Sequence, residues 1–318
     1  MDLKTLNGIV AGFRPAAVLH VACSLKVFTL LAGGELPLDE LAGRCNAKPE
    51  MLEKLLIALI AMGLLERRGG AYRNTEFSDT WLVEGRPLYQ GDIVAHSASL
   101  WDFWGGLENE ILRDDAPRPA SDPHRKFIMG MHNLAVTSRA KTLAEHVDLR
   151  GRRKLFDVGG GPGTYSIALC RRFPELHAVV FDLPETVAIA REVIAREGMQ
   201  ERVTAQPGSW DTDGFGSGND AVLISNVLHG PNSKAEMKLR KAFDSLAAGG
   251  LLIVQDFVLN DDKTGPLIPA LFNIMLGAYS RPELFALIEQ AGFARPRVAA
   301  TMEEAGSTVV AAQKEKTG

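Results

Sequence analysis

The sequence contains few cysteines, and they lie far apart. Cys23, Cys45 and Cys170 are the only three in 318 residues, and no two of them have the CxxC spacing of a redox or zinc site. A scattered, odd-numbered set excludes a disulfide framework and is typical of a reduced, cytoplasmic protein. The histidines also lack the spacing of metal ligands, so we predict no metal site.

Long apolar runs and an excess of positive charge are also absent. The longest apolar stretch, LLIALIAMGLL at 55–65, is too short to span a bilayer, and the N-terminal segment lacks the apolar core of a secretory signal. The formal net charge is −4, which gives no general attraction to nucleic acid or to an anionic membrane. We therefore expect a cytoplasmic protein with neither a nucleic-acid nor a membrane partner.

The pattern of the chain changes near residue 150. Before that point apolar residues recur mostly with helical spacing, and after it short β-rich runs alternate with amphipathic segments. We predict three parts, namely a domain at 1–95, a helical linker at 96–150 and an α/β domain at 151–318. Within the linker we expect helices at 97–113 and 123–147, separated by a proline-rich loop.

The first part has the element order of a winged helix. Predicted helices at 16–32, 36–46 and 48–63 precede two short strands around a Gly-Gly turn at 69–70. Winged helices often bind DNA, but six basic residues stand against eight acidic ones across 38–84. The third helix is rich in leucine and isoleucine on nearly every face, which suits burial between subunits. The sequence therefore favours a dimerisation domain over a DNA-binding one.

The second half predicts an α/β fold with a mostly parallel, seven-stranded sheet. We expect strands at 154–159, 177–182, 202–206, 220–226, 251–257, 295–300 and 307–313, and helices at 163–173, 185–198, 234–247 and 281–292. Alternating strands and helices form right-handed crossovers that cover both faces of the sheet. Ligands of such sheets bind beyond the carboxyl ends of the strands, so functional residues are expected just after each strand.

The stretch LFDVGGGPGTYS at 155–166 is a glycine-rich loop that follows the first predicted strand. No lysine follows it, as a phosphate-binding P-loop requires, and Thr164 and Ser166 stand where the dinucleotide fingerprint needs glycine. What remains is an acid and alternating glycines, at Asp157, Gly159, Gly161 and Gly163. A carboxylate at this position disfavours a pyrophosphate and suits a ligand that carries positive charge.

A second acid narrows the identity of that ligand. Asp182 ends the next strand, about twenty residues after the loop, where a carboxylate accepts hydrogen bonds from both ribose hydroxyls. The loop and this acid together indicate a nucleoside with positive charge and no phosphate, a description that fits S-adenosylmethionine (SAM). The alternative is a glycine turn that serves only close packing.

With these motifs, the chain resembles small-molecule O-methyltransferases that join a winged-helix dimerisation domain to a Rossmann-like SAM-binding domain. Plant caffeate-type enzymes and bacterial antibiotic and pigment methyltransferases are examples. The similarity extends from about residue 12 to residue 313 and depends on LFDVGGGPGTYSIAL, VVFDLPETV, VLISNVLHG and LLIVQDFVLND. It implies a homodimer formed through the N-terminal helices, SAM as cofactor, S-adenosylhomocysteine (SAH) as product, and methyl transfer to a hydroxyl of a small aromatic metabolite.

The resemblance also implies roles for particular residues. His229 matches the catalytic histidine, as general base, and Asp256 matches one of two acids that often brace it. The implied cofactor site comprises Asp157, Gly159, Gly161, Gly163, Asp182, Leu183, Ser209, Trp210 and Ser225. The implied acceptor pocket comprises Trp101, Trp104, Met129, His132, Asn133, Phe272, Met275 and Tyr279. The alternative for His132 is a position on the helix surface, and the alternative for the aromatic residues and Met275 is an ordinary packing role.

Three positions depart from the family pattern. Ser209 stands where relatives commonly have an aspartate near the adenine, Gly230 replaces the aspartate that often follows the histidine, and the second bracing acid would fall near Ala278. With one brace, His229 either takes a proton or only orients the acceptor. A more acidic nucleophile, such as a thiol of pKa ~8.5, tolerates weaker bracing. Methyl transfer to sulfur or carbon, another SAM-dependent reaction, and a SAM-responsive winged-helix regulator therefore remain as alternatives.

Overall fold

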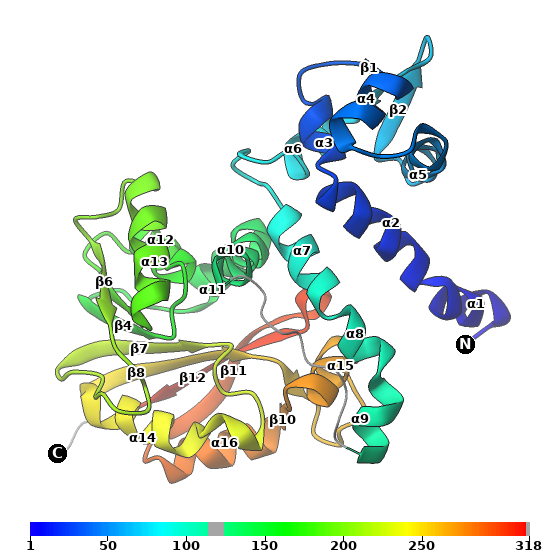
Figure 1. Cartoon of the computed structure of the whole chain (residues 1–318). Coiled ribbons are helices and arrows are strands. Elements are labelled where there is room, and N and C mark those ends of the chain that lie inside the picture. Colours follow the sequence, from blue (N-terminus) through cyan, green and yellow to red (C-terminus); the bar gives the residue numbers. More distant parts are fainter. Residues whose placement is uncertain (114–123, 316–318) are drawn as a thin grey trace. The chain divides into compact units, whose positions relative to one another are not determined.

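The computed structural model describes residues 1–113 and 124–315, and the chain divides into two compact units, Met1–Leu134 and Ala135–Gly318 (Figure 1). The predicted proline-rich loop lies outside the described residues. The two units are described separately below.

The first unit is mainly helical and contains a three-stranded sheet of order β1-β3-β2. Its helices are α1 (Leu3–Ala11), α2 (Phe13–Ser24), α3 (Val27–Leu31), α4 (Leu38–Cys45), α5 (Pro49–Ala61), α6 (Glu76–Trp81), α7 (Gly91–Ser99), α8 (Trp101–Gly105), α9 (Leu107–Arg113) and α10 (His124–Leu134). Its strands are β1 (Leu36–Pro37), β2 (Leu65–Arg68) and β3 (Ala71–Asn74). The predicted hairpin around the Gly-Gly turn is confirmed, since β2 and β3 pair antiparallel.

One predicted helix of this unit is two helices in the structure. The expected helix at 16–32 is interrupted after α2, because Lys26 adopts a left-handed backbone conformation with φ 56°. The break lets α3 turn its apolar side chains into the core, where Val27 and Phe28 have no exposed surface. Leu41, Leu56 and Leu59 from α4 and α5 complete this core.

The first two helices and α5 carry many apolar side chains on their surface. Six of these side chains are between 47% and 64% exposed, namely Leu6, Ile9, Phe13, Val21, Met51 and Ile57. By length and composition alone, the segment Leu3–Ser24 is apolar enough to cross a membrane. One such segment is weak evidence for a membrane span, since a helix that packs against another protein surface has the same composition.

The second unit is built on a seven-stranded sheet of order β11-β12-β8-β7-β4-β5-β6. Its strands are β4 (Lys154–Val158), β5 (His177–Asp182), β6 (Val203–Pro207), β7 (Asn219–Ser225), β8 (Leu246–Asp256), β11 (Ala294–Met302) and β12 (Ser307–Gln313). The neighbours from β6 to β8 pair parallel, whereas β12 pairs antiparallel with β8 and with β11. The predicted Rossmann-like fold with a mostly parallel sheet is confirmed.

Helices cover both faces of this sheet (Figure 1). One face is covered by α11 (Ala140–His146), α12 (Thr164–Arg172) and α13 (Pro184–Arg196), and the other by α14 (Ala235–Ser245) and α16 (Arg281–Gln290). A short parallel pair, β9 (Val258–Leu259) with β10 (Tyr279–Ser280), flanks α15 (Leu267–Met275). The strand order reverses between β4 and β7, so the loops after β4, β5, β7 and β8 meet at one edge of the sheet.

Candidate active site

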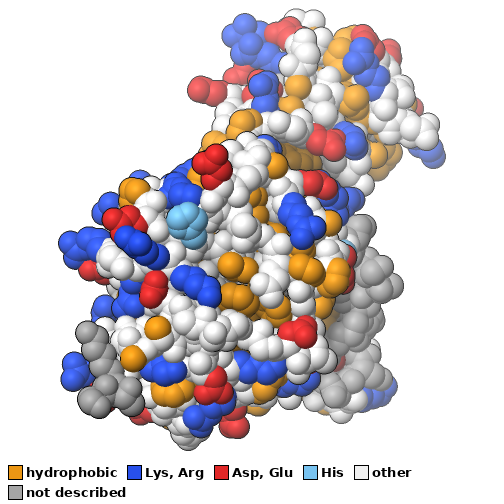
Figure 2. All heavy atoms as spheres, turned by 90° about the vertical axis from the view of Figure 1, so that its left-hand side faces the viewer, with side chains coloured by type: hydrophobic (Ala, Val, Ile, Leu, Met, Phe, Trp, Pro, Cys, Tyr) orange, Lys and Arg blue, Asp and Glu red, His pale blue; other side chains and the backbone are white. Residues whose placement is uncertain are grey.

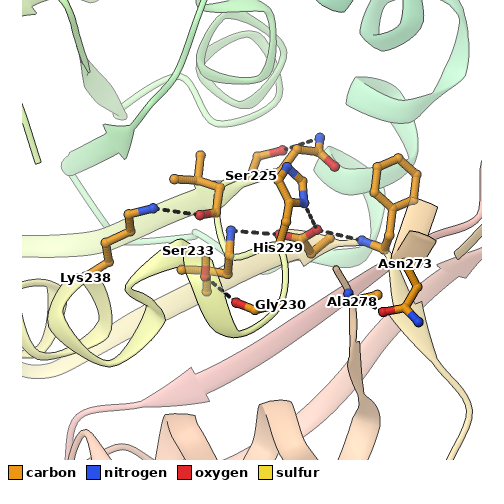
Figure 3. A network of polar contacts seen from close by, with 12 residues as sticks. Ser225, His229, Gly230, Ser233, Lys238, Asn273 and Ala278 are labelled. Atoms are coloured by element: carbon orange, nitrogen blue, oxygen red, sulfur yellow. Dashed lines mark hydrogen bonds and ion pairs between the residues drawn. The ribbon is translucent and has the colours of Figure 1, made fainter. Parts of the chain in front are cut away.

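His229 lies in the loop after β7, beside the carboxyl end of β8. Its Nδ1 lies 2.8 Å from Oδ1 of Asp256, the last residue of β8, and the His229 side chain is 22% exposed (Figure 3). A carboxylate oxygen accepts hydrogen bonds, so Nδ1 carries the hydrogen and donates it. The other ring nitrogen, Nε2, is then left with a lone pair that can accept a proton.

The carboxylate of Asp256 is itself held in place by backbone groups. The backbone N–H of Leu228 donates to its Oδ2 at 3.0 Å, and the N–H of Phe257 donates to its Oδ1 at 2.8 Å. The side chain is only 4% exposed, and these bonds satisfy a charge that would otherwise be costly to bury. The structure therefore brings His229 and Asp256 together in a fixed orientation, as their sequence positions imply.

Lys238 of α14 is a buried cation that was not expected from the sequence. Its Nζ donates to the carbonyl of Val227 at 2.8 Å (Figure 3). The same Nζ lies 4.4 Å from the ring centroid of Trp210. Burial lowers the pKa of Lys238 to about 8, against the opposing effect of nearby carboxylates. The ammonium group of Lys238 thus contacts both the loop that carries His229 and the indole of Trp210, which follows β6. An amphipathic helix pattern gives no signal for such a role, because a lysine on a helix usually faces solvent.

The loop after His229 packs directly on the segment before β10, where the family resemblance places a second bracing acid. A β-carbon on Gly230 would lie 2.8 Å from Cα of Gly277, so only glycine permits this approach. The neighbouring Ala278 is buried, and its N–H donates to Oδ1 of Asn273 at 2.9 Å. Here the two segments are in close contact through the backbones of Gly230 and Gly277.

The glycine loop after β4 needs glycine for two reasons. Gly159, Gly161 and Gly163 all have left-handed backbone conformations, with φ of 65°, 54° and 79°. A β-carbon on Gly159 would also lie 2.8 Å from Val227 and 2.9 Å from Trp210. The loop is thus a cradle of backbone atoms that side chains from the two neighbouring loops approach closely.

Asp182, at the end of β5, fixes the shape of this loop. Its Oδ2 accepts a hydrogen bond from the N–H of Gly161 at 2.8 Å, and its Oδ1 accepts one from the N–H of Leu183 at 2.7 Å. A carboxylate has about four lone-pair sites, so one such group can accept several donors at once. Asp182 therefore orders the loop after β4 at the carboxyl edge of the sheet.

Asp157 lies beneath the loop and has no exposed surface. The hydroxyl of Ser166 donates to its Oδ2 at 2.6 Å, while Oδ1 has no hydrogen-bond partner in the described part of the chain. Burial raises the pKa of this carboxyl to about 7, and the nearby Asp182 adds to the rise. A buried, unsatisfied carboxylate oxygen fits a neighbouring ligand that carries positive charge.

We expect the pKa shift of Asp157 to appear in the stability of the protein. Because the folded-state pKa is raised from 3.8 to about 7, the stability that this group contributes is lost as the pH rises across that interval. Between about pH 5 and about pH 8, the free energy of unfolding should fall by about 2–3 kcal/mol more in the parent than in Asp157→Asn. Denaturant unfolding of both proteins at the two pH values measures this difference, and parallel pH dependences would contradict it.

The remaining expected cofactor residues lie after neighbouring strands. Ser209 and Trp210 follow β6, where Oγ of Ser209 accepts a hydrogen bond from the N–H of Asp211 at 3.2 Å. Leu183 caps α13 and is 39% exposed, and Ser225 ends β7. These positions, the cradle and the unsatisfied oxygen of Asp157 fit an adenosine ligand with a positive charge.

The expected acceptor residues are divided between the two units. In the second unit the ring of Phe272 stacks on Phe257 at 3.9 Å, and Phe257 lies 6.1 Å from the His229 ring. Met275 lies on the same helix as Phe272, and Tyr279 lies in β10. The other five expected residues lie in the first unit, namely Trp101, Trp104, Met129, His132 and Asn133. Among the described residues, no group of three or more His, Cys, Asp or Glu side chains is arranged to hold a metal ion.

Two of the expected acceptor residues in the first unit lie inside its helical packing. His132 and Asn133 on α10 are buried, with 5% and 4% of their surface exposed. The Oδ1 of Asn133 accepts a hydrogen bond from the N–H of Ile93 at 3.3 Å, which ties α10 to α7. Trp101 and Trp104 are 41% and 36% exposed.

The sheet order, the glycine cradle after β4 and the acid after β5 define the class of Rossmann-like SAM-dependent methyltransferases. The chain belongs to the O-methyltransferase family. The family model for the O-methyltransferase domain matches residues 116–294, and the one for the O-methyltransferase dimerisation domain matches residues 8–84. The protein is therefore an enzyme that uses SAM as its cofactor.

Individual relatives agree with this assignment. The chain is 36% identical over 290 residues to 3-hydroxy-5-methyl-1-naphthoate 3-O-methyltransferase of Streptomyces sahachiroi, covering 87% of this chain and 84% of that enzyme. It is 30% identical to the N,N-dimethyltransferase OxyT of Streptomyces rimosus, covering 91% and 90% of the two chains. The structure of human N-acetylserotonin methyltransferase in complex with SAM superposes with a TM-score of 0.87 at 25% identity, covering 99% of each chain.

Proposed function

We propose that the enzyme transfers the methyl group of SAM to a hydroxyl of a small aromatic acceptor, and that His229 takes the hydroxyl proton. The observation that supports this proposal is the His229–Asp256 pair, in which Nδ1 is bonded to a buried carboxylate. That bond leaves Nε2 free to act as a base beside the cofactor loop.

SAM supplies an activated methyl group on a positively charged sulfur. The chain has two tasks in the displacement, which are to align the acceptor oxygen with that methyl group and to remove the proton. Alignment contributes about 7–11 kcal/mol in favourable cases. Transfer of a proton from a phenol of pKa ~10 to an imidazole of pKa ~6.5 is uphill by about 5 kcal/mol. Asp256 lowers this cost because its carboxylate stabilises the imidazolium that forms.

The cofactor is held, in this proposal, by the cradle and by the acids around it. Asp182 accepts the ribose hydroxyls, Asp157 offsets the positive charge from below, and the backbone of Gly159, Gly161 and Gly163 surrounds the ligand. Trp210 covers the adenine face, and Ser209 lies beside it in the loop after β6. Leu183 and Ser225 complete the site from the ends of β5 and β7.

An aromatic acceptor is supported by the side chains beside His229 and by a relative. The stacked rings of Phe257 and Phe272 form a flat apolar wall near the histidine. The 36% identical relative is named for methylation of a hydroxyl on a naphthoate. Met275 and Tyr279 are the other residues of the second unit that we propose to bind the acceptor. From the first unit we propose Trp101, Trp104, Met129, His132 and Asn133 as acceptor-binding residues. Transfer to nitrogen is the second candidate, because the relative OxyT is named as an N,N-dimethyltransferase.

We also propose a cytoplasmic homodimer that assembles through the N-terminal helices. The matched dimerisation domain and the exposed apolar side chains of α1, α2 and α5 support this assembly, which would cover the apolar surface of Leu3–Ser24. Figure 2 shows one face of the molecule, on which acidic and basic side chains are interspersed. That mixture and the net charge of −4 favour small-molecule substrates over nucleic acid or anionic membrane.

A matched set of acceptors tests the proposed reaction. The enzyme is incubated with methyl-labelled SAM and with 3-hydroxy-1-naphthoate, 3-amino-1-naphthoate or 3-mercapto-1-naphthoate, and the labelled products are separated. We expect label mainly on oxygen, at a rate at least about tenfold above that for nitrogen or sulfur, because the His229–Asp256 pair assists deprotonation of a weak acid. Label mainly on nitrogen would contradict the proposal and support the second candidate.

A further inference from the structure

Arg139 is a partly buried cation that forms no ion pair with the part of the chain that the structure describes. It ends the π-helical turn Ala135–Arg139 that precedes α11. Its Nη2 donates to the carbonyl of Ala305 at 3.2 Å, and within residues 124–315 no aspartate or glutamate forms an ion pair with it. A guanidinium has five N–H donors, so most of its hydrogen-bonding capacity is unused.

The neighbouring tyrosine does not supply the missing negative charge. Burial lowers the pKa of Arg139, and the nearby Tyr165 is the group that opposes this effect. Burial also raises the pKa of Tyr165 above its usual value, so its phenol carries no negative charge at neutral pH. A buried charge without a partner is costly, and proteins retain one where a ligand pairs with it.

The position of Arg139 connects it with the site of methyl transfer. Tyr165 stands in the first turn of α12, directly after the glycine cradle, and its hydroxyl accepts a hydrogen bond from Nε2 of Gln255 at 2.8 Å. Gln255 immediately precedes Asp256, which holds His229. Ala305 lies in the turn before β12, and that strand begins beside the end of β8. The guanidinium therefore lies at the same carboxyl edge of the sheet as the cofactor loop and the histidine.

We propose that Arg139 binds a carboxylate of a ligand in the methyl-transfer site. A guanidinium presents paired N–H donors that match the two oxygens of a carboxylate, and such a bidentate bond also fixes orientation. Two ligands of this enzyme can carry that group, namely the methionine part of SAM and an aromatic acid that serves as acceptor. Binding of the methionine carboxylate requires only that the enzyme uses SAM, whereas binding of an aromatic acid as acceptor rests on the proposed function.

Binding measurements with matched ligands test this inference and separate the two sources. SAH is compared with S-adenosyl-3-thiopropylamine, which is SAH without its carboxylate, by isothermal titration of the full-length enzyme. 3-Hydroxy-1-naphthoate is then compared with 3-hydroxy-1-naphthamide in the presence of saturating SAH. We expect the parent to prefer the carboxylate by at least about tenfold in one of the two pairs, and Arg139→Met to lose that preference.

The control is Arg191→Met, because Arg191 also donates to one backbone carbonyl, that of Ala205 at 3.3 Å, but is exposed. Arg139→Lys keeps the positive charge but lacks the paired N–H donors, so it should retain part of the preference for the carboxylate ligand. This variant keeps the inference testable if Arg139→Met does not fold. Loss of preference in the SAH pair assigns the cofactor as the source, and loss in the naphthoate pair assigns the acceptor. Unchanged preferences in both pairs, or no preference in the parent, would overturn the inference. Failure of SAH to bind the parent at all would instead contradict the cofactor assignment.

Discussion

Replacing His229 by alanine should lower kcat for methyl transfer to a phenol by about 10²–10⁴-fold, the usual contribution of a general base. The affinity for SAH should change little, because the imidazole is bonded to Asp256 and not to the cradle. Asp256→Asn should also lower kcat, since an amide neither stabilises the imidazolium nor enforces the correct tautomer. Single-turnover rates with labelled SAM, together with SAH titrations, separate the chemical step from binding.

His146→Ala is a suitable control for this experiment. The Nδ1 of His146 is also hydrogen-bonded, to the carbonyl of Thr142 at 2.8 Å, but that histidine lies on the exposed surface of α11. Turnover of this variant should match the parent. If His229→Ala keeps nearly full turnover at neutral pH, His229 is not the base, and alignment of the acceptor with the methyl group is sufficient for the reaction.

Replacing Asp182 by alanine should weaken SAH binding by about 30- to 1000-fold, which corresponds to about 2–4 kcal/mol. Two effects add, because the variant loses the acceptor for the ribose hydroxyls and also the bond that orders the N–H of Gly161. Titration calorimetry measures the affinity directly. The Michaelis constant for SAM should rise in parallel.

Asp220→Ala separates a cofactor role from a merely structural one. The carboxylate of Asp220 also accepts two backbone N–H groups, those of Arg153 and Lys154 at 2.7 and 2.9 Å, but it does so at the opposite, amino edge of the sheet. Both variants lose two backbone bonds, yet only Asp182→Ala should lose SAH affinity. Equal losses in the two variants would show that Asp182 acts only through folding.

Most of the α/β unit could be predicted from the sequence, because its signals are local. Strands such as β4 and β5 are short apolar runs followed by glycine or proline, and the helices between them have regular amphipathic spacing. The helix α15 was missed, since its nine residues are apolar on most sides and resemble a buried strand or loop. The long helix expected at 123–147 contains a π-helical turn at Ala135–Arg139. Such a turn has wider hydrogen-bond spacing than an α-helix, and a single sequence carries no residue pattern that predicts it.

The site residues that belong to sequence motifs could be predicted, whereas those that reach the site through tertiary packing could not. Asp182 and the glycines follow strands at recognisable spacings, and His229 and Asp256 were found through family resemblance. Lys238 and Arg139 lie near the site only because the fold brings distant segments against them. Lys238 donates to the carbonyl of Val227, and Arg139 donates to the carbonyl of Ala305. Long-range burial of a charged side chain has no local signature.

The central claim is that His229 takes the proton of the accepting hydroxyl, and its most direct test is the dependence of the rate on acceptor acidity. Methyl transfer is measured at neutral pH for two naphthols that differ in hydroxyl pKa, about 7 and about 10, with the parent and with His229→Ala. The account predicts that the variant loses at least about 100-fold on the weaker acid and less than about tenfold on the stronger one, about half of which is already ionised. Equal losses on both acceptors would contradict it, because they would show that His229 only positions the substrate.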